Sequence, residues 1–399
     1  MTSSHTSSPT ALGIALRGLV ALAVAMGVGR FSFTPQLPLM QADLGLTLTG
    51  GGWLAGANYL GYLVGALLAG RRGLSAAALM RAGLWIVVIS TAAMAVTGSL
   101  TLWLAMRFIA GVASAWVLVG TASVILARLG QFGGQRLDGL VFSGVGTGIA
   151  LAGLICWLGG LAESGAVALW LVLAAFALVG VLFVFTDRSP SSASNTQTNA
   201  SATKPAQAHD SARDSRLLVC CYGLFGFGYI LPATYLPAQA RLLLETPAMF
   251  GWVWPVFGLA AAVSTLLVTR LTRWQRRHIW AGAQCIMAVG IAWPIVSPGL
   301  VGLAVAALSV GGAFMLITLL GLQEARAQAG AHAQQRLAAM TAAFAVGQLL
   351  GPLVANLLQI QGFTLDAALW LGVAALLLSS ALLVCKNQQY LQKRKRKNL

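Results

Sequence analysis

Two arginines lie deep within long apolar stretches of this sequence. Arg30 follows a Gly-Val-Gly step in the first stretch, and Arg107 lies in the fourth. A charged side chain inside a membrane span costs several kcal/mol and is a candidate functional residue for that reason. The planar guanidinium fork pairs with a carboxylate or a phosphate. These two residues therefore favour the binding of a small organic anion.

The apolar stretches contain no acidic residue that could neutralise the two cations. Glu324, at the end of the tenth stretch, comes nearest. Two interpretations stay open for each arginine. Each could contact a substrate, or Arg107 could bond backbone carbonyls while Arg30 extends toward the membrane surface. Because these stretches also lack histidine, the sequence indicates no proton carrier and leaves open whether a coupling ion is used. Anion exchange or uniport fits that absence.

Further polar residues on the same stretches are candidate substrate contacts. Asn58 and Tyr62 stand four residues apart and therefore share one face of a helix. Gln348 lies on the eleventh stretch, and Tyr229 on the seventh. Because tyrosines are more often packing residues than ligand contacts, these four are weaker candidates than the arginines.

The elements that must position these residues are membrane-spanning helices. Hydrophobic residues make up 58% of the 399-residue chain and charged residues 9%, whereas a soluble domain carries about 25% charged residues. About twenty apolar residues cross a membrane as a helix, and continuously apolar stretches exclude strands. The predicted spans are 12–38, 52–70, 77–97, 100–127, 139–160, 167–187, 217–240, 250–271, 279–296, 299–322, 337–360 and 367–385.

The basic residues indicate the orientation of these spans. They lie in alternate loops and at the C-terminus, whereas the opposite loops contain a single basic residue, Arg241. Positive charge is retained on the cytoplasmic side, which predicts a multi-pass protein of the bacterial inner membrane with both termini in the cytoplasm. The net charge of +16 then reflects membrane topology, and binding of nucleic acid is not expected. The alternative for residues 12–29 is a cleaved signal peptide.

An internal repeat argues against the signal peptide, because the first span has a counterpart later in the chain. An offset of 199 residues places Gly27–Gly29 on Gly226–Gly228, Leu37-Pro38 on Leu236-Pro237, and Gly52-Trp53 on Gly251-Trp252. The same offset places Arg30 on Tyr229. Duplication of a six-helix unit explains the match better than chance similarity of Gly/Leu-rich sequence.

The repeat and a Ser/Ala/Thr/Asn-rich interruption predict the domain organisation. We expect an all-α polytopic fold of twelve transmembrane helices in two six-helix bundles. Its parts are a disordered cytoplasmic tail (1–11), the N-terminal bundle (12–187), a disordered cytoplasmic linker (188–215), the C-terminal bundle (216–385) and a basic cytoplasmic tail (386–399).

Four motifs carry a resemblance to a known family. They are GVGRFSFTPQLPLM (27–40), WLAGANYLGYLVGAL (53–67), RFIAGVASAW (107–116) and AVGQLLGPLVA (345–355). Together they resemble the YbfB/YjiJ-like branch of the major facilitator superfamily, over nearly the whole chain. The resemblance implies alternating access, with spans one, four, seven and ten lining a central cavity. It also implies an acidic residue after span two, where this chain has Ala69, so the usual charge latch is in doubt.

Small residues recur at every fourth position on three spans. The stripes contain Gly61 and Gly65 on span two, Gly144 and Gly148 on span five, and Gly347 and Gly351, followed by Pro352, on span eleven. Such stripes let helix backbones approach closely. Because the resemblance implies that these spans meet between the halves, the stripes are either a sliding contact used in gating or ordinary tight packing.

These observations predict a monomeric secondary transporter that moves a small solute, expected to be an organic anion, through the lipid bilayer. Efflux of hydrophobic or aromatic compounds is the alternative, and a membrane sensor that transports nothing is a remote one. An enzyme is not expected, because the spans hold no convergent acid, base or metal groups. No nucleotide-binding loop is present, and the scattered cysteines and histidines predict neither a cofactor nor a metal.

Overall fold

The computed structural model describes residues 10–96, 98–186, 205–243, 251–271 and 274–397, and these ranges contain helices and no strand. Eleven of the described helices are long and apolar enough to cross a membrane, and a twelfth, Val253–Val268, is apolar but shorter. The twelve apolar helices match the twelve predicted spans in order. The prediction of an all-helical membrane protein is therefore confirmed.

The first predicted span is a continuous helix of three parts, α1 (Ala11–Leu22), the π-helix η1 (Ala23–Phe31) and α2 (Phe33–Leu44). The other helices of the N-terminal half are α3 (Leu48–Ala69), α4 (Ala76–Ala93), α5 (Leu100–Gln131), α6 (Asp138–Leu161) and α7 (Ala166–Phe185). Those of the C-terminal half are α8 (Pro205–Leu243), α9 (Val253–Val268), α10 (Arg276–Val296), α11 (Leu300–Ala329), α12 (Ala333–Ile360) and α13 (Leu365–Lys397). Single 3-10 turns, η2 (Gln135–Leu137) and η4 (Gly330–His332), precede α6 and α12.

Two helices extend into segments for which we predicted a linker and a tail. Helix α8 begins at Pro205, inside the predicted linker 188–215, and α13 continues to Lys397, through most of the predicted tail 386–399. Proline is favoured in the first turn of a helix, and the Gln-, Leu- and Lys/Arg-rich end of α13 consists of good helix formers. The predicted linker residues 188–204 and the tail residues 1–9 lie outside the described ranges.

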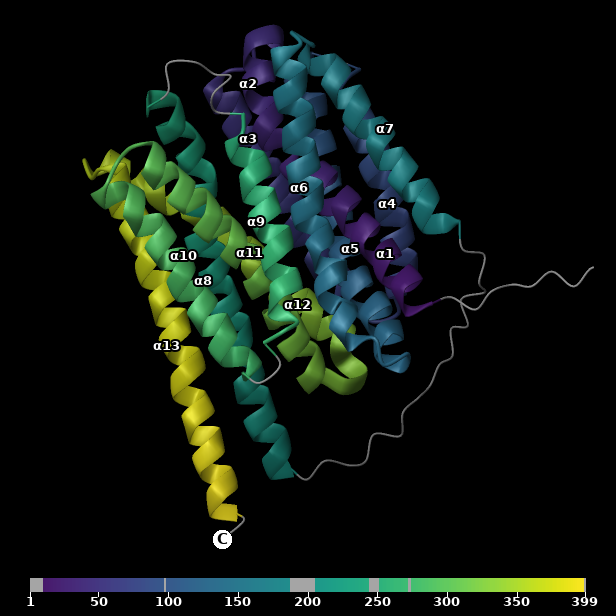
Figure 1. Ribbon diagram of the computed structural model, residues 1–399, viewed down its shortest axis with the longest axis vertical. Helices are drawn as coiled ribbons and strands as arrows, with labels where there is room; N and C mark the ends of the chain where they lie inside the picture. The colour runs from purple at the N-terminus through teal and green to yellow at the C-terminus, as the bar shows by residue number, and fades with distance from the viewer. Residues whose placement is uncertain (1–9, 97, 187–204, 244–250, 272–273, 398–399) are drawn as a thin grey trace, which may run out of the picture.

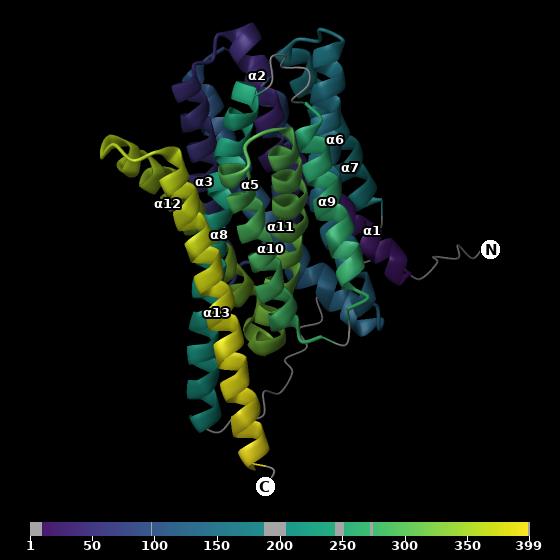
Figure 2. The ribbon, with the colours of Figure 1, turned by 60° about the vertical axis from the view of Figure 1, so that its left-hand side comes forward.

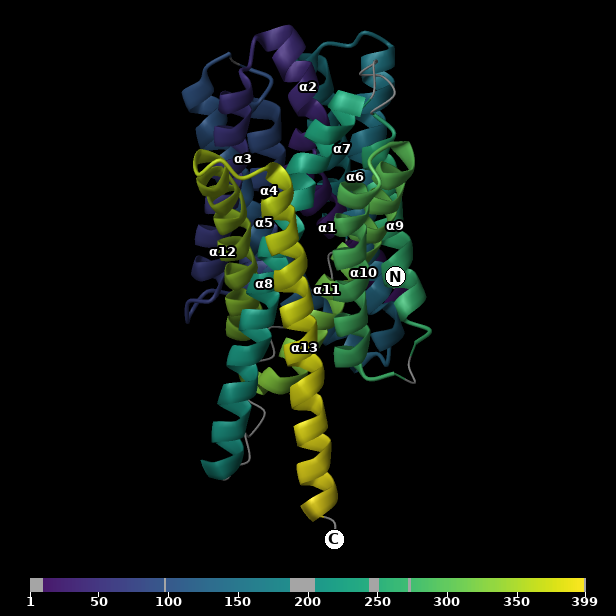
Figure 3. The ribbon, with the colours of Figure 1, turned by 90° about the vertical axis from the view of Figure 1, so that its left-hand side faces the viewer.

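The helices run roughly parallel to the long axis of the molecule (Figure 1). Helices α6 and α9 pack against each other in the middle of this view, and α3 packs against α12, so that helices from both halves of the sequence meet in two places. Figures 2 and 3 show α8 and α13 reaching past the other helices at one end. We call this the arginine-rich end, because the loops that contain Arg71, Arg136 and Arg270 lie there.

The predicted small-residue stripes contact helices of their own half. Gly61 and Gly65 of α3 lie against the backbone of α5, at Phe108 and Val112. Gly144 and Gly148 of α6 lie against the carbonyls of Leu19 in α1 and Ala23 in η1. Gly347 and Gly351 of α12, next to Pro352, lie against α8. The structure thus places these glycines in ordinary tight packing and not between the halves.

Other glycines of α6 make the contact between the halves. Gly139 lies against the carbonyl of Thr265, Gly146 against the backbone of Ala262, and Gly153 against Pro255, all on α9. Their spacing of seven residues keeps them on one face of α6. This second stripe was not predicted, because its glycines recur at every seventh position and not at every fourth.

The packing of α3 on α5 gives a test with a matched control. A methyl group at Gly61 would clash with the carbonyl of Phe108, whereas one at Gly56, on the same helix, would meet nothing within 4 Å. Overpacking typically costs about 1–3 kcal/mol. We expect Gly61→Ala to lower the melting temperature of the purified protein in detergent, and Gly56→Ala to leave it unchanged or raise it slightly. Equal melting temperatures for the two variants would contradict the packing described.

Candidate functional site

The candidate site is built on η1, a helix with wider turns than an α-helix. All nine residues of η1 are buried. Two glycines give the wide helix room, since Gly27 lies against the backbone of Gly148 in α6 and Gly29 faces Ser114 and Val87. π-helical turns are rare and occur often at functional sites. Here the π-helix ends with Arg30 and Phe31, one turn before Pro35.

The wide turns of η1 leave backbone carbonyls that accept hydrogen bonds from side chains. Ser114 donates to the carbonyl oxygen of Ala25 at 2.7 Å, and Ser32 donates to that of Val28 at 2.5 Å. Pro35 has no N–H group, so it cannot donate to the carbonyl of Phe31, four residues before it. A buried carbonyl without a donor is destabilising, and the cost is higher where no water can replace the donor.

Arg107 donates to two carbonyls at the end of η1. Its Nη1 donates to the carbonyl oxygen of Gly29 at 3.1 Å, and its Nη2 donates to that of Arg30 at 2.9 Å. Asn58 of α3 donates in turn to the carbonyl oxygen of Arg107 at 2.9 Å, and the guanidinium lies 4.9 Å from the centre of the Phe33 ring. Arg107 therefore bonds to backbone carbonyls, as one of its two predicted roles required. These bonds hold the backbone that carries Arg30.

Arg30 is 3% exposed and does not extend toward the membrane surface. Its Nη2 donates to Oε1 of Gln348 on α12, and its guanidinium carbon lies 3.7 Å from the centre of the Tyr62 ring. Its Nε and Nη1 have no hydrogen-bond partner among the described residues. Neither arginine is paired with a carboxylate in the described part of the chain. Arg30 therefore keeps two donors that a ligand could use.

Buried aromatic rings from the C-terminal half adjoin Arg30. The Phe31 ring meets the Phe314 ring edge to face at 5.6 Å, and Phe314 stacks on Tyr229 at 4.2 Å. The hydroxyl of Tyr229 is buried without a hydrogen-bond partner, and Tyr229 is within electrostatic range of Arg30. We call this group the aromatic cluster; its members are Tyr222, Phe225, Tyr229, Phe314 and Phe344.

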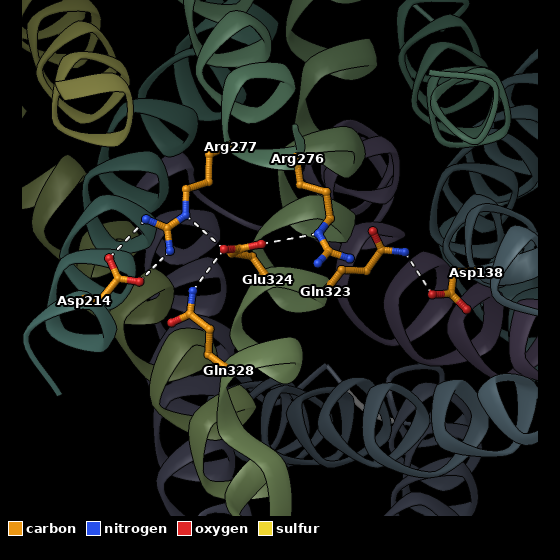
Figure 4. Close-up of polar contacts among 7 residues, drawn as sticks. All are labelled: Asp138, Asp214, Arg276, Arg277, Gln323, Glu324 and Gln328. Atoms are coloured by element: carbon orange, nitrogen blue, oxygen red, sulfur yellow. Dashed lines mark hydrogen bonds and ion pairs between the residues drawn. The ribbon is translucent and has the colours of Figure 1, made fainter. Parts of the chain in front are cut away.

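A second polar group lies at the arginine-rich end (Figure 4). Arg277 of α10 pairs with Asp214 of α8 through two hydrogen bonds, at 3.0 and 2.5 Å, and its Nε donates to Glu324 of α11 at 2.9 Å. Arg276 also contacts Glu324, at 3.3 Å. Glu324, the acid that the sequence places nearest to the two buried arginines, is thus occupied by Arg276 and Arg277 at the end of the helices.

A cavity of about 760 Å³ opens beside this group, between α5 and α6 on one side and α9, α10 and α11 on the other. Arg136, Arg276 and Arg326 contribute to its lining together with Asp138. Asp138 is 8% exposed, and its carboxylate accepts a hydrogen bond from Gln323 of α11 at 2.8 Å. This bond joins the two halves of the chain.

A second bond between the halves lies where the sequence lacks the expected acid. Gln334 of α12 donates to the carbonyl oxygens of Ala69 and Leu74, at 2.9 and 3.0 Å. An amide bound to backbone carbonyls thus occupies the place of a charge latch. Gln334 makes hydrogen bonds between neutral groups, and the bond from Gln323 to Asp138 has a charge on the acceptor only. Both are weaker than a hydrogen bond between two oppositely charged groups.

The structure brings together most of the predicted site residues. Arg30 contacts both Tyr62 and Gln348. Arg107 contacts the backbone of Arg30, and Asn58 bonds to the backbone of Arg107. Tyr229 belongs to the adjacent aromatic cluster. The sequence did not predict several other residues, namely Asp138, Gln323, Gln334 and the phenylalanines of the aromatic cluster. Asp138 could have been found, because it directly precedes the predicted span 139–160. The phenylalanines come from distant helices and share no spacing that would have identified them.

Comparisons with known proteins agree with the fold. A family model described as "Uncharacterised MFS-type transporter YbfB" matches residues 22–384. The chain matches no curated protein sequence. Among solved structures, it is similar to the crystal structure of the human organic anion transporter MFSD10 (TETRAN), with a TM-score of 0.68 and 16% sequence identity over 95% of this chain and 99% of that one. At this identity the similarity concerns the fold alone.

The contacts of Arg107 predict that replacing Arg107 and replacing Arg30 have different effects on the stability of the protein. Arg107→Gln removes two hydrogen bonds from a charged donor, each worth about 1.5–3 kcal/mol, and should lower the melting temperature markedly. Arg30→Gln removes a partly unpaired buried charge and should leave it unchanged or raise it. Thermal unfolding of the purified protein, followed by tryptophan fluorescence, checks both. Equal stability of Arg107→Gln and the unmodified protein would contradict this role for Arg107.

Proposed function

Because the chain belongs to the YbfB-like family of major facilitator superfamily transporters, we propose that it moves a small organic anion across the bacterial inner membrane by alternating access. In this proposal it is a monomeric secondary transporter with both termini in the cytoplasm. The arginine-rich end is then the cytoplasmic end, in line with the retention of positive charge on that side.

The proposal includes two six-helix bundles, residues 12–187 and 216–385, related by the 199-residue repeat. Contacts that recur at this offset support it. Gly148 packs against Gly27 of η1, and its counterpart Gly347 packs against Gly226 of α8, the counterpart of Gly27. In transporters built from such repeats, the substrate binds near the middle of the membrane between the bundles. Arg30 and Gln348, which come from different halves, form such a contact.

The observation that carries the anion assignment is the free hydrogen-bonding capacity of Arg30. Its charge is buried, and its Nε and Nη1 have no partner in the described part of the protein. A buried cation that is not paired with an anion costs several kcal/mol. A carboxylate on Arg30 would remove that cost and accept a charge-assisted hydrogen bond from one of these donors. The fold neighbour MFSD10 is described as an organic anion transporter.

Efflux of hydrophobic or aromatic compounds is the second candidate function. The aromatic cluster favours it, because apolar rings line pockets for such compounds. The two candidates differ in what Arg30 contributes. Its charge is essential for an anion and dispensable for a lipophilic compound.

Alternating access requires that the contacts between the halves at the arginine-rich end separate. Three such contacts are the bond from Gln323 to Asp138, the bonds made by Gln334, and the approach of α3 to α12 at Gly70 and Ala338. Neither of these hydrogen-bonded contacts is an ion pair, so separation of that end breaks no pair of opposite charges among them. The cavity beside Asp138 then enlarges into a cytoplasmic opening.

Replacement of Arg30 tests the anion assignment. In proteoliposomes, Arg30→Gln should reduce uptake of labelled lactate and benzoate about 100-fold or more, since leaving one partner of a buried charge pair alone costs about 3–5 kcal/mol. Flux of the lipophilic cation ethidium should not change. Arg81→Gln, which alters an exposed arginine on α4, serves as the control. Carboxylate uptake that survives Arg30→Gln would refute the assignment, and ethidium flux without carboxylate uptake would support efflux.

A reversible cross-link tests alternating access. A Cβ atom placed at Gly70 lies 3.2 Å from the Cβ of Ala338, which is close to the separation in a disulfide, about 3.5–4.5 Å. The double variant Gly70→Cys/Ala338→Cys should lose transport on oxidation and regain it with a reductant, because the bond holds the arginine-rich end closed. Each single variant should transport under both conditions. Full transport by the cross-linked protein would rule out this gate.

A further inference from the structure

We propose that the transported anion is an aromatic monocarboxylate, held with its carboxylate on Arg30 and its ring against the aromatic cluster. This inference rests on the proposed anion transport and specifies the class of substrate. Three features of the site support it, namely the number of free cations, the lack of an acid, and the position of the rings.

The number of free cations limits the charge of the substrate. Arg107 already donates through Nη1 and Nη2 to two carbonyl oxygens and keeps Nε alone, whereas Arg30 keeps both Nε and Nη1 without a partner among the described residues. One guanidinium with free donors matches one carboxylate. A dicarboxylate or a phosphate dianion would bring a second negative charge with no free cation beside it, and an unpaired buried charge is strongly unfavourable. A single negative charge therefore fits the site.

The unpaired polar atoms near Arg30 are mostly donors. Besides Nε and Nη1 of Arg30, they include Nε2 of Gln348 and the hydroxyl of Tyr229. The matching ligand group is an acceptor with several lone pairs, which an ionised carboxylate provides. A neutral amide offers fewer lone pairs and no charge. The donors around Arg30 thus select the charged form of the ligand.

The absence of an acid beside this group argues against zwitterions. Among the described residues that are buried, Asp138 is the one acidic side chain, and it lies at the arginine-rich end bonded to Gln323. The ammonium of an amino acid would meet the guanidinium of Arg30 without a compensating carboxylate. Amino acids are therefore poor ligands for this site, although their carboxylates could pair with Arg30.

The aromatic rings begin directly beside the charged group. Phe31 follows Arg30 in the chain, and its ring lies 5.6 Å from that of Phe314, which stacks on Tyr229 at 4.2 Å. Phe344 packs within 6.4 Å of Phe314 and 6.0 Å of Tyr229. A ring joined to the bound carboxylate reaches this cluster without a long spacer. Stacked or edge-to-face pairs favour an aromatic ring over a saturated one.

Five probes separate these features in a titration of the full-length protein in lipid nanodiscs. Benzoate carries both groups, cyclohexanecarboxylate lacks the aromatic ring, benzamide lacks the charge, terephthalate has a second charge, and phenylalanine adds an ammonium. We expect benzoate to bind most tightly and cyclohexanecarboxylate about 2- to 10-fold more weakly. Benzamide, terephthalate and phenylalanine should bind about 30-fold more weakly or worse.

Two variants locate the preference in the cluster. Phe314→Leu should remove the preference for benzoate over cyclohexanecarboxylate while cyclohexanecarboxylate still binds, which also shows that the variant is folded. Phe142→Leu alters a buried phenylalanine of α6 outside the aromatic cluster and should keep the preference.

The outcomes distinguish this inference from the proposed function. Equal affinities for benzoate and cyclohexanecarboxylate, or tight binding of terephthalate or phenylalanine, would overturn the inference and leave anion transport standing. A benzamide affinity equal to that of benzoate would overturn both. Failure of benzoate to bind would overturn the inference, and lactate uptake that depends on Arg30 would then still support anion transport.

Discussion

The forked donation from Arg107 to the carbonyl oxygens of Gly29 and Arg30 is the interaction on which the buried site depends. Inside a membrane, backbone groups must find partners within the protein. A cation on α5 donates to two carbonyls at the end of η1, in the turn before Pro35. The same contact spreads the charge of Arg107 over two backbone dipoles, so this arginine needs no carboxylate. Arg30 is then held on a fixed backbone with its own donors free.

Close packing of helices makes this arrangement possible. The π-helix fits between α5 and α6 because Gly27 and Gly29 present no side chain to these neighbours. Glycines of α3, α6 and α12 bring other helix pairs equally close within each half of the chain. The halves themselves meet along a different set of glycines on α6. Glycine therefore permits close approach of backbones both within each half and between the halves.

The sequence predicted the helices well because their signal is local. Each span is a run of about twenty apolar residues, and this run can be recognised without knowledge of its neighbours. The rotation of a helix is not local. Helix α6 has small residues on two faces, at Gly144 and Gly148 and at Gly139, Gly146 and Gly153, and spacing alone does not tell which face meets which helix. For Arg107, the sequence left two roles open, substrate contact and bonding to backbone carbonyls. Its observed partners include the carbonyl of a residue 77 positions away in the chain, and a local pattern does not reveal such a contact.

The repeat gives the site its chemical asymmetry. Position 30 and its counterpart 229 lie on the first helix of each half, and one is now a cation while the other is a tyrosine stacked on Phe314. If both positions had kept arginine, two like charges would lie close together in a medium of low dielectric, at a cost of several kcal/mol. If both were aromatic, nothing would recognise charge. A buried cation from the N-terminal half therefore lies beside apolar rings from the C-terminal half. The ligand that we propose carries a charge at one end and an apolar body at the other, because only such a ligand satisfies both groups at once.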